Sequence, residues 1–185
     1  MYHFTLQRHE HLSAAQLHEL GLFRHRVFVS RLGWDLPGVR RDTLIEFDEF
    51  DTTGTCYVLA RDGKRNLIGC TRLLPTTRPY LLGQVFAHLC GDSVPHDPQV
   101  WELSRYGAAS DLHPGLGIDL FKASLRFAAH LGARDVIAVT NTSIERYFRR
   151  EKVQFRRLCA PVAHAREHLV ALDFCGNQYS QLEAS

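Results

Sequence analysis

The pattern of apolar and polar positions in the first part of the chain predicts a strand, a helix and a hairpin. Weak alternation favours a strand over Tyr2–Gln7. Ser13 is a suitable N-cap for a helix from Ala14 to Arg31, where apolar residues recur at helical spacing. Two runs of strand-forming residues, Thr55–Arg61 and Leu67–Leu74, flank the sequence Asp-Gly-Lys-Arg-Asn, which predicts a hairpin turn.

Residues 33–45 break this pattern and predict an exposed, mobile loop. Gly33, Pro37 and Gly38 interrupt regular structure in this stretch. Trp34 lies in the middle of it, and a large aromatic residue is unusual in a simple connection. The loop is therefore a candidate for contact with a ligand.

The rest of the chain alternates helices and strands without repeats or a linker. The pattern predicts helices over Tyr80–Leu89, Gly117–Leu131 and Ser143–Glu151, and strands over Val100–Gly107, Asp135–Thr140, Phe155–Cys159 and His168–Phe174. This order predicts an α/β (α+β) three-layer sandwich, with one mixed central sheet flanked by helices. We expect residues 1–185 to form a single domain.

Composition and targeting signals favour a cytoplasmic protein. The 185 residues are 45% hydrophobic and 23% charged, which is ordinary for a globular domain. No apolar run approaches the roughly 18 residues that span a membrane, and the N-terminus lacks the order of a secretory signal. The five cysteines are widely spaced without a Cys-x-x-Cys motif, so we expect them to be reduced and mostly buried.

Charge is distributed unevenly although the net charge is only +2. Residues 42–62 hold six acids and one base, whereas residues 122–168 hold ten Lys or Arg against four acids. The basic half suits an acidic macromolecular partner. No zinc-finger spacing or RNA-recognition signature is present, so we do not expect nucleic acid to be that partner. Arg146 and Arg150 lie on a predicted helix that either is a solvated face or docks an acidic partner.

Two short motifs carry little weight. His164-Ala-Arg-Glu-His168 matches a zinc-peptidase pattern, but it runs directly into an apolar strand, and we expect a solvated face without metal. Gly115-Leu-Gly117 opens a helix and could present backbone N–H groups to phosphate. A turn and helix cap explains the same glycines.

Acids, arginines and aromatic residues interleave in three strings that no helix or strand needs for its own stability. They are Glu46-Phe-Asp-Glu-Phe-Asp51, the segment from Gly69 to Leu82 that contains Arg72, and Trp101-Glu-Leu-Ser-Arg105. An acidic cluster must be neutralised, and Arg72 and Arg105 are the expected partners. Such a network either holds a cleft together or binds a small zwitterion. The aromatic residues nearby, Phe28, Trp34 and Phe86 among them, favour a walled site for a zwitterion with a flat ring.

These strings resemble those of the LuxI-type acyl-homoserine-lactone synthases. The resemblance is carried by Arg24-x-x-Val-Phe28, Gly33-Trp34-Asp35, Glu46-x-Asp48-x-Phe-Asp51, Gly69-Cys-x-Arg72-Leu-Leu-Pro-Thr-Thr, Pro79-Tyr-Leu-Leu, Val85-Phe86 and Trp101-Glu-Leu-Ser-Arg105. They occur in the family's order and approximate spacing, and the resemblance is looser after Gly107.

The resemblance implies a fold like that of the Gcn5-related N-acetyltransferases and a reaction without a cofactor. Members of the LuxI-type family take S-adenosylmethionine as the acyl acceptor and an acylated acyl carrier protein as the acyl donor. Some relatives take acyl-coenzyme A as the donor instead. The product is an N-acyl-homoserine lactone, a quorum-sensing signal.

The resemblance also implies roles for individual residues. Glu102 would be the base for the acceptor amine, directly or through a water, and the backbone around Ser104 and Arg105 would hold the oxyanion. Arg24, Asp48, Asp51, Arg72 and Arg105 would shape the acceptor pocket, with Phe28 and Trp34 on its adenosyl side and Phe86 among its aromatic walls. Thr140 would lie near the acyl chain, and Arg146 and Arg150 would dock the carrier protein.

Two other functions compete with this reading. A general N-acyltransferase using acyl-coenzyme A needs a good pyrophosphate loop, and Leu112 stands where such a loop has a basic residue or glutamine. A ligand-binding sensor of the same fold would have lost part of the charged site, which is complete here.

Overall fold

The structure, a computed structural model, describes residues 1–36, 43–164 and 167–175. It comprises two compact units. Unit 1 is Met1–Leu73 with Arg105–Ser124, and unit 2 is Leu74–Ser104 with Leu125–Ser185. Within the described residues, no helix is long and apolar enough to cross a membrane.

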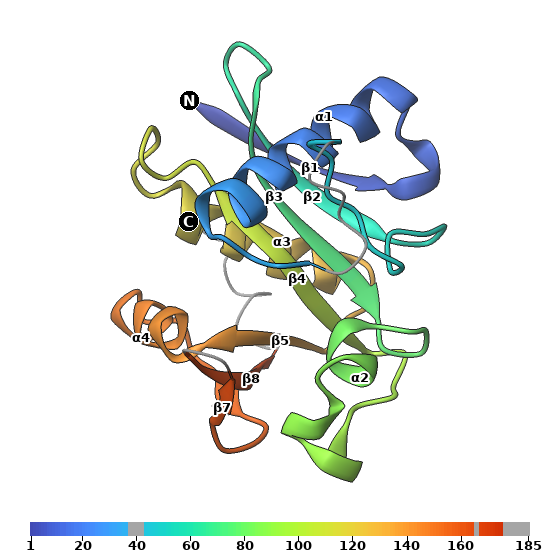
Figure 1. Ribbon diagram of the computed structural model, residues 1–185, viewed down its shortest axis with the longest axis vertical. Coiled ribbons are helices and arrows are strands. Elements are labelled where there is room, and N and C mark those ends of the chain that lie inside the picture. Colours follow the sequence, from blue (N-terminus) through green and yellow to red (C-terminus); the bar gives the residue numbers. More distant parts are fainter. Residues whose placement is uncertain (37–42, 165–166, 176–185) are drawn as a thin grey trace. The chain divides into compact units, whose positions relative to one another are not determined.

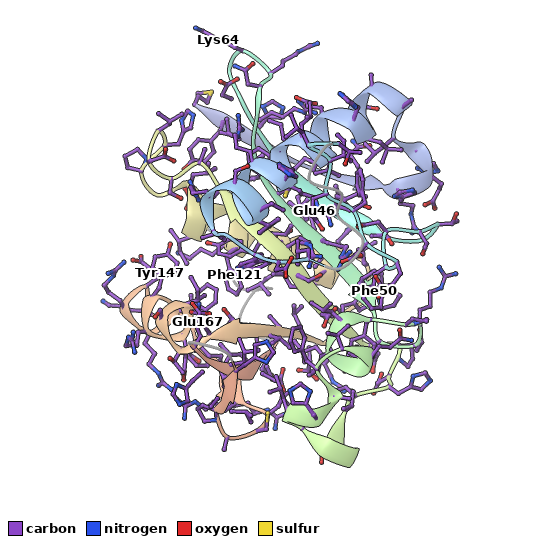
Figure 2. All side chains as sticks on the ribbon, in the orientation of Figure 1. Glu46, Phe50, Lys64, Phe121, Tyr147 and Glu167 are labelled. Carbon is purple, nitrogen blue, oxygen red and sulfur yellow. The ribbon has the colours of Figure 1, made fainter. Side chains whose placement is uncertain are left out.

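The sheet of unit 1 begins with the predicted strand and hairpin. Its strands are β1 (Tyr2–Arg8), β2 (Cys56–Asp62), β3 (Leu67–Pro75) and the end of β4 (Val100–Ala108). The pairs β1–β2 and β2–β3 are antiparallel, with a bulge between Ala60 and Arg61. The hairpin closes because the Asp62 carboxylate accepts the N–H groups of Lys64 and Asn66. Lys64 marks the tip of this hairpin (Figure 2).

Helices cover both faces of the unit 1 sheet. Helix α1 (Ala14–Arg24) starts at a capping box formed by Ser13 and Gln16. It does not continue as an α-helix to Arg31 as predicted, because His25–Arg31 forms the π-helical segment η2.

The first part of α3 (Leu116–His130) covers the opposite face, with Ser124 hydrogen-bonded to Thr71 of β3. Figure 1 shows α1 and α3 on opposite sides of β3. Unit 1 therefore has the three predicted layers.

The sheet of unit 2 is mixed, as predicted. Its further strands are β5 (Asp135–Asn141), β6 (Arg156–Arg157), β7 (Val162–His164) and β8 (Glu167–Cys175). The start of β4 runs parallel to β5, from Val100 opposite Asp135 to Glu102 opposite Ile137. Strand β8 is antiparallel to β5 and also pairs with β6 and β7. The predicted strand Phe155–Cys159 is thus only two residues long, and β7 was not predicted.

In unit 2 the predicted helix over Ser143–Glu151 is confirmed with a shift of one residue, whereas the predicted helix over Tyr80–Leu89 is divided. The region predicted as one helix over Tyr80–Leu89 divides into α2 (Leu81–Gln84) and the 3-10 turn η3 (Ala87–Leu89), and a second 3-10 turn, η4 (Gly91–Ser93), follows it. Helix α4 (Thr142–Arg150) starts at Asn141, whose side chain accepts two backbone N–H groups. It packs on β8 through Phe148, whose ring lies edge-on to that of Phe174.

The His-x-x-Glu-His motif does not form a helical metal site. His164 ends β7 and His168 lies in β8, where Ala163 pairs with His168 and His164 with Glu167. The two imidazoles are therefore on a hairpin rather than one turn apart on a helix. The part of the chain that the structure describes contains no group of three or more His, Cys, Asp or Glu that could hold a metal.

Candidate active site

Glu46 reaches the interior of unit 1 because a glycine faces it from α1. A Cβ atom on Gly21 would lie 2.7 Å from Ile45 and 2.8 Å from Phe47, so only glycine lets this segment approach the helix. The backbone N–H of Glu46 donates to the Gly21 carbonyl at 3.2 Å. Glu46 is fully buried as a result, and Figure 2 shows it inside the unit.

Glu46 and five other charged side chains form a closed ring in which arginines and acids alternate. In order they are Arg24, Glu46, Arg105, Asp48, Arg72 and Asp51, which contacts Arg24 again. Arg24 forms a fork to each neighbour, at 2.5 and 3.0 Å to Glu46 and at 2.8 and 3.0 Å to Asp51. The three arginines and three acids balance, so the ring carries no net charge.

Asp48 closes the other side of the ring. Its two carboxylate oxygens lie 2.5 Å from Arg72 and 2.6 Å from Arg105. Arg72 also lies 3.2 Å from Asp51, and Arg105 lies 3.0 Å from Glu46. Paired carboxylates and guanidiniums of this kind hold one another in fixed positions.

Two acids of the ring, Asp51 and Glu46, have lowered pKa values despite their burial. Burial alone would raise the pKa of Asp51, but the charges of Arg24 and Arg72 outweigh it and hold that pKa well below its usual range. The pKa of Glu46 is lowered in the same way, since Arg24 and Arg105 outweigh the effect of burial. Because both pKa values are lowered, the stability that these carboxylates contribute is lost only as the pH falls through them.

Each arginine of the ring also faces an aromatic ring. The guanidinium carbon of Arg24 lies 5.0 Å from the ring centre of Phe47, that of Arg72 5.6 Å from Phe50, and that of Arg105 5.9 Å from Phe28. Cations over aromatic faces are stabilised by the ring quadrupole. Phe47 and Phe50 of the acidic string, together with Phe28, therefore stabilise the charged guanidinium groups of the ring.

One side of the ring is more accessible than the rest. The side chains of Asp48 and Arg105 are 8% and 6% exposed, while the other four members are between 0% and 2% exposed. Phe28, beside Arg105, stacks on Trp34 with ring centres 4.9 Å apart and planes 20° apart. Trp34 is 43% exposed. This side offers a carboxylate, a guanidinium and a flat aromatic surface to a ligand.

The predicted loop over residues 33–45 is described only at its two ends. Residues 37–42 lie outside the described residues. Gly33 has a φ of +69°, which glycine adopts without strain. The turn at Gly33 leads into Trp34, whose N–H donates to the Phe28 carbonyl at 2.9 Å.

Strand β4 departs from regular geometry at Arg105. Arg105 has a φ of +51°, in the left-handed region, which costs a non-glycine residue about 1–3 kcal/mol. The ion pairs of Arg105 with Glu46 and Asp48 hold this conformation. Strained residues that their surroundings hold in place are concentrated at functional sites.

Glu102 lies on β4 in unit 2, three residues before Arg105. Its side chain is buried, and its two carboxylate oxygens accept the backbone N–H groups of Leu81 at 2.9 Å and Leu82 at 2.7 Å. These N–H groups belong to the first turn of α2, where they have no partner within the helix. Glu102 therefore holds the start of α2 against β4.

The other predicted residues of unit 2 lie on separate elements. Ser104 is half-buried on β4, and Thr140 lies in β5 opposite Val170 of β8. Phe86 follows α2, with its ring centre 6.1 Å from that of His164. Their roles toward a substrate stay predictions.

The basic residues around α4 divide into two kinds. Arg149 and Arg157 both bond the buried carboxylate of Glu145 at 2.8 Å, so they are structural. Arg146 is exposed and bonds Ser143, and the side chain of Arg150 is 74% exposed and lies 3.5 Å from Glu151. Part of the basic excess is thus neutralised inside unit 2, and Arg146 and Arg150 remain candidates for a partner.

Two members of the site in unit 1, Glu46 and Tyr57, were given no individual role by the sequence analysis. Glu46 lies in the same acidic string as Asp48 and Asp51, and its position two residues before Asp48 could have identified it. Tyr57 donates its hydroxyl to Asp51 at 2.8 Å. Nothing in the sequence distinguishes Tyr57 from other strand residues.

Gly115 lies directly before α3 and fits a turn, and Gly117 is already within the helix. Gly115 has a φ of +83°, and a Cβ there would meet nothing within 4 Å. It ends a turn that leads into the helix, and Leu112 in this turn is 74% exposed. The geometry matches the turn-and-cap explanation of Gly115-Leu-Gly117.

Comparison with known proteins identifies close relatives. A family model described as autoinducer synthase matches residues 8–182. The acyl-homoserine-lactone synthase of Pseudomonas aeruginosa is 48% identical over 94% of this chain and 86% of its own length.

Solved structures agree with the sequence comparison. TofI in a ternary complex with an inhibitor and MTA superimposes with a TM-score of 0.85 and 40% identity, over 97% of this chain and 94% of TofI. BjaI, a CoA-dependent acyl-homoserine lactone synthase solved with SAM and isopentyl-CoA, gives a TM-score of 0.86 at 28% identity, over 98% and 87% of the two chains.

A more distant structure bears on the fold alone. An acyl-CoA N-acyltransferase from Pseudomonas aeruginosa gives a TM-score of 0.69 at 18% identity, over 94% of this chain and 99% of the other. The predicted fold class, an acyltransferase-like sandwich with a mixed sheet, is confirmed.

Proposed function

Since the chain belongs to the autoinducer synthase family and is an acyl-homoserine-lactone synthase, we propose that it acylates S-adenosylmethionine with an acyl group from an acyl carrier protein. The α-amine attacks the acyl thioester and releases the carrier thiol. The carboxylate then displaces methylthioadenosine from the carbon next to the sulfonium and closes the lactone. We propose that residues 1–185 carry out both steps as one cytoplasmic domain.

The observation that carries this proposal is the accessible side of the charged ring. A zwitterion needs an anionic and a cationic partner at a fixed separation, and Asp48 and Arg105 are directly bonded at 2.6 Å. In the proposal, Asp48 takes the ammonium group and Arg105 takes the carboxylate. Arg72 holds Asp48 in place and Glu46 holds Arg105. Arg24 and Asp51 close the ring behind them. BjaI, at 28% identity, was solved with SAM, which supports this acceptor.

The stacked pair of Phe28 and Trp34 suits the adenosyl group of the acceptor. Phe28 contacts both Arg105 and Trp34, so the aromatic surface begins where the charged ring ends. Planar rings and sulfonium cations both bind aromatic faces well. In the proposal, Trp34 covers the adenine and Phe28 separates it from the charges.

Glu102 receives the proton of the acceptor amine in this proposal. The backbone N–H groups of Leu81 and Leu82 fix the position of its carboxylate. The nitrogen becomes far more acidic once it has attacked the thioester, so a carboxylate can take its proton at that stage. Backbone N–H groups around Ser104 and Arg105, where β4 leaves regular geometry, serve as the oxyanion donors.

The carrier of the acyl group, an acyl carrier protein or coenzyme A, distinguishes this proposal from its nearest alternative. BjaI is a CoA-dependent relative with the same fold, so membership of the family does not decide between carrier protein and coenzyme A. Arg146 and Arg150 are four positions apart on α4 and form an exposed basic surface on one face. An acidic carrier protein fits that surface.

Mass spectrometry of the reaction products tests the donor. With S-adenosylmethionine, we expect acyl carrier proteins to give lactone and stoichiometric methylthioadenosine at a kcat/KM at least about tenfold above that of the same chains on coenzyme A, which corresponds to about 1.4 kcal/mol. Equal or faster turnover of acyl-coenzyme A would overturn the proposed donor. No lactone from either donor would overturn the proposed reaction.

Charge reversal on α4 tests the docking surface. The variant Arg146→Glu with Arg150→Glu is expected to raise KM for the acyl carrier protein about tenfold or more, because two attractions become repulsions. KM for S-adenosylmethionine should stay unchanged, and the salt dependence of kcat/KM should weaken. Steady-state kinetics at two ionic strengths measures all three.

The matched control reverses two exposed cations elsewhere, Lys64→Glu with Arg126→Glu. It changes the net charge equally and should leave KM for the carrier near the wild-type value. An equal effect of both variants would mean that overall charge, and not the α4 surface, attracts the carrier.

A further inference from the structure

Two cysteines of unit 2 lie against each other although 69 positions separate them. The Sγ atoms of Cys90 and Cys159 are 2.8 Å apart. Cys90 directly follows η3, where its N–H donates to the Ala87 carbonyl at 3.1 Å. Cys159 lies between β6 and β7, one residue after Leu158, whose N–H donates to Ala171 of β8 at 2.9 Å. Backbone hydrogen bonds at or next to each cysteine therefore fix the two chain segments that bring the sulfurs together.

The distance between the two sulfurs is unusual for free thiols. It is shorter than unbonded sulfur atoms normally keep, and longer than the S–S bond of about 2.05 Å. Both cysteines are half-buried, so a small oxidant reaches them from solvent. The remaining cysteines are different in kind, since Cys56 and Cys70 are buried and Cys175 is exposed.

We propose that Cys90 and Cys159 are a site of reversible oxidation, where a two-electron oxidant such as hydrogen peroxide closes a disulfide between the β6–β7 connection and the segment after α2. Overall, two thiols and one peroxide give one disulfide and two waters. The two sulfurs lose two electrons and two protons, and the peroxide is reduced. A dithiol reductant restores the thiols by exchange.

The two sulfurs react in two steps. One thiol attacks the peroxide and becomes a sulfenic acid, releasing water. The sulfur of the other cysteine, which lies 2.8 Å away, then displaces the sulfenic hydroxyl group, which leaves with that cysteine's proton as a second water.

The crosslink would act on the segment that meets Glu102. Leu81 and Leu82 of α2 donate to Glu102, and Cys90 closes the same short run of helical turns. The ring of Phe86 in this run already contacts His164 of β7. A disulfide from Cys90 to Cys159 ties the run to the same hairpin region, so residues 81–93 should open less often.

Counting thiols after oxidation tests the proposal. The full chain is treated with hydrogen peroxide, its free thiols are blocked with iodoacetamide, and the digest is analysed by mass spectrometry. We expect the blocked groups to fall from five to three, with a Cys90 peptide joined to a Cys159 peptide and separated by dithiothreitol. Hydrogen–deuterium exchange should slow over residues 81–93 in the oxidised chain alone.

Single substitutions provide the controls. Cys159→Ser and Cys90→Ser should each abolish the joined peptide and the change in exchange, and either variant alone suffices. Cys175→Ser should keep both, because Cys175 takes no part. Five blocked thiols after peroxide, a joined peptide containing Cys175, or a crosslink that leaves exchange over residues 81–93 unchanged would each overturn the proposal.

Discussion

Replacing Glu102 by Gln is expected to lower kcat by about 10²- to 10⁴-fold, the usual contribution of a positioned acid or base. Gln keeps the size of the side chain but cannot accept a proton at neutral pH. Its amide oxygen can still accept one of the two N–H groups that Glu102 bonds, from Leu81 or Leu82. KM for S-adenosylmethionine should therefore change little, and steady-state kinetics separates the two constants.

A second substrate distinguishes proton transfer from a structural role of Glu102. S-adenosylmethionine already acylated on its nitrogen needs only the lactone-closing step, in which no amine loses a proton. Glu102→Gln should turn this substrate over at nearly the wild-type rate, and Glu49→Gln, an exposed acid in the same region of sequence as Asp48, should leave both reactions unchanged. Slow turnover of both substrates by Glu102→Gln would assign Glu102 the role of holding α2 in place.

Strands and helices with strong local signals could be predicted from the sequence. The hairpin of β2 and β3 followed from the Asp62 turn, and the start of α1 followed from Ser13. The path after Arg24 could not be predicted, because the change to a π-helix depends on packing and leaves apolar spacing nearly intact. The break after α2 is similar, since Val85 and Phe86 are compatible with a helix and only tertiary contacts end it there.

The sequence predicted which residues belong to the charged site better than it predicted how they contact one another. Acids and arginines buried together must pair, so the sequence indicated a network that includes Asp48, Asp51 and Arg72. It did not indicate that the network closes, because closure depends on Glu46, which Gly21 admits to the interior. The meeting of Cys90 and Cys159 was equally hidden, since 69 residues of chain separate them.

If the ring binds a zwitterion as proposed, its closed and neutral arrangement keeps the binding charges of opposite sign in fixed positions. Isolated buried charges of either sign cost several kcal/mol each, and a pocket that holds both signs must keep them from collapsing onto each other. Here each charge has partners on both sides. The positions of Asp48 and Arg105 are then fixed before any ligand arrives, which is the condition for selective binding.

Replacing Arg24 by Met is expected to reduce the free energy of unfolding by about 3–5 kcal/mol, the loss typical of breaking a buried ion pair. Met approximates the length of the arginine stem, but Glu46 and Asp51 lose both of their forked contacts while staying buried. Acid unfolding should also move to higher pH, because Arg24 is the largest of the charges that lower the pKa of each carboxylate. Urea unfolding at two pH values measures both effects.

The surface pair of Arg61 and Glu19 supplies the matched control. Its side chains are 18% and 40% exposed, so Arg61→Met should cost only about 0–1 kcal/mol. If Arg24→Met cost no more than this, the ring would contribute no more to stability than a surface pair.

The double variant Arg24→Met with Glu46→Gln shows where the cost of losing Arg24 arises. If the loss comes from uncompensated carboxylates, removing the charge of Glu46 should recover about 1–2 kcal/mol of the stability lost in Arg24→Met, within the range of coupling between contacting residues. Activity should stay absent in both variants, because Asp48 and Arg105 lose the support of the ring. Recovered stability without recovered turnover would separate the two proposed roles of the ring, since neutralising Glu46 relieves the charge imbalance without restoring the geometry proposed to hold the acceptor.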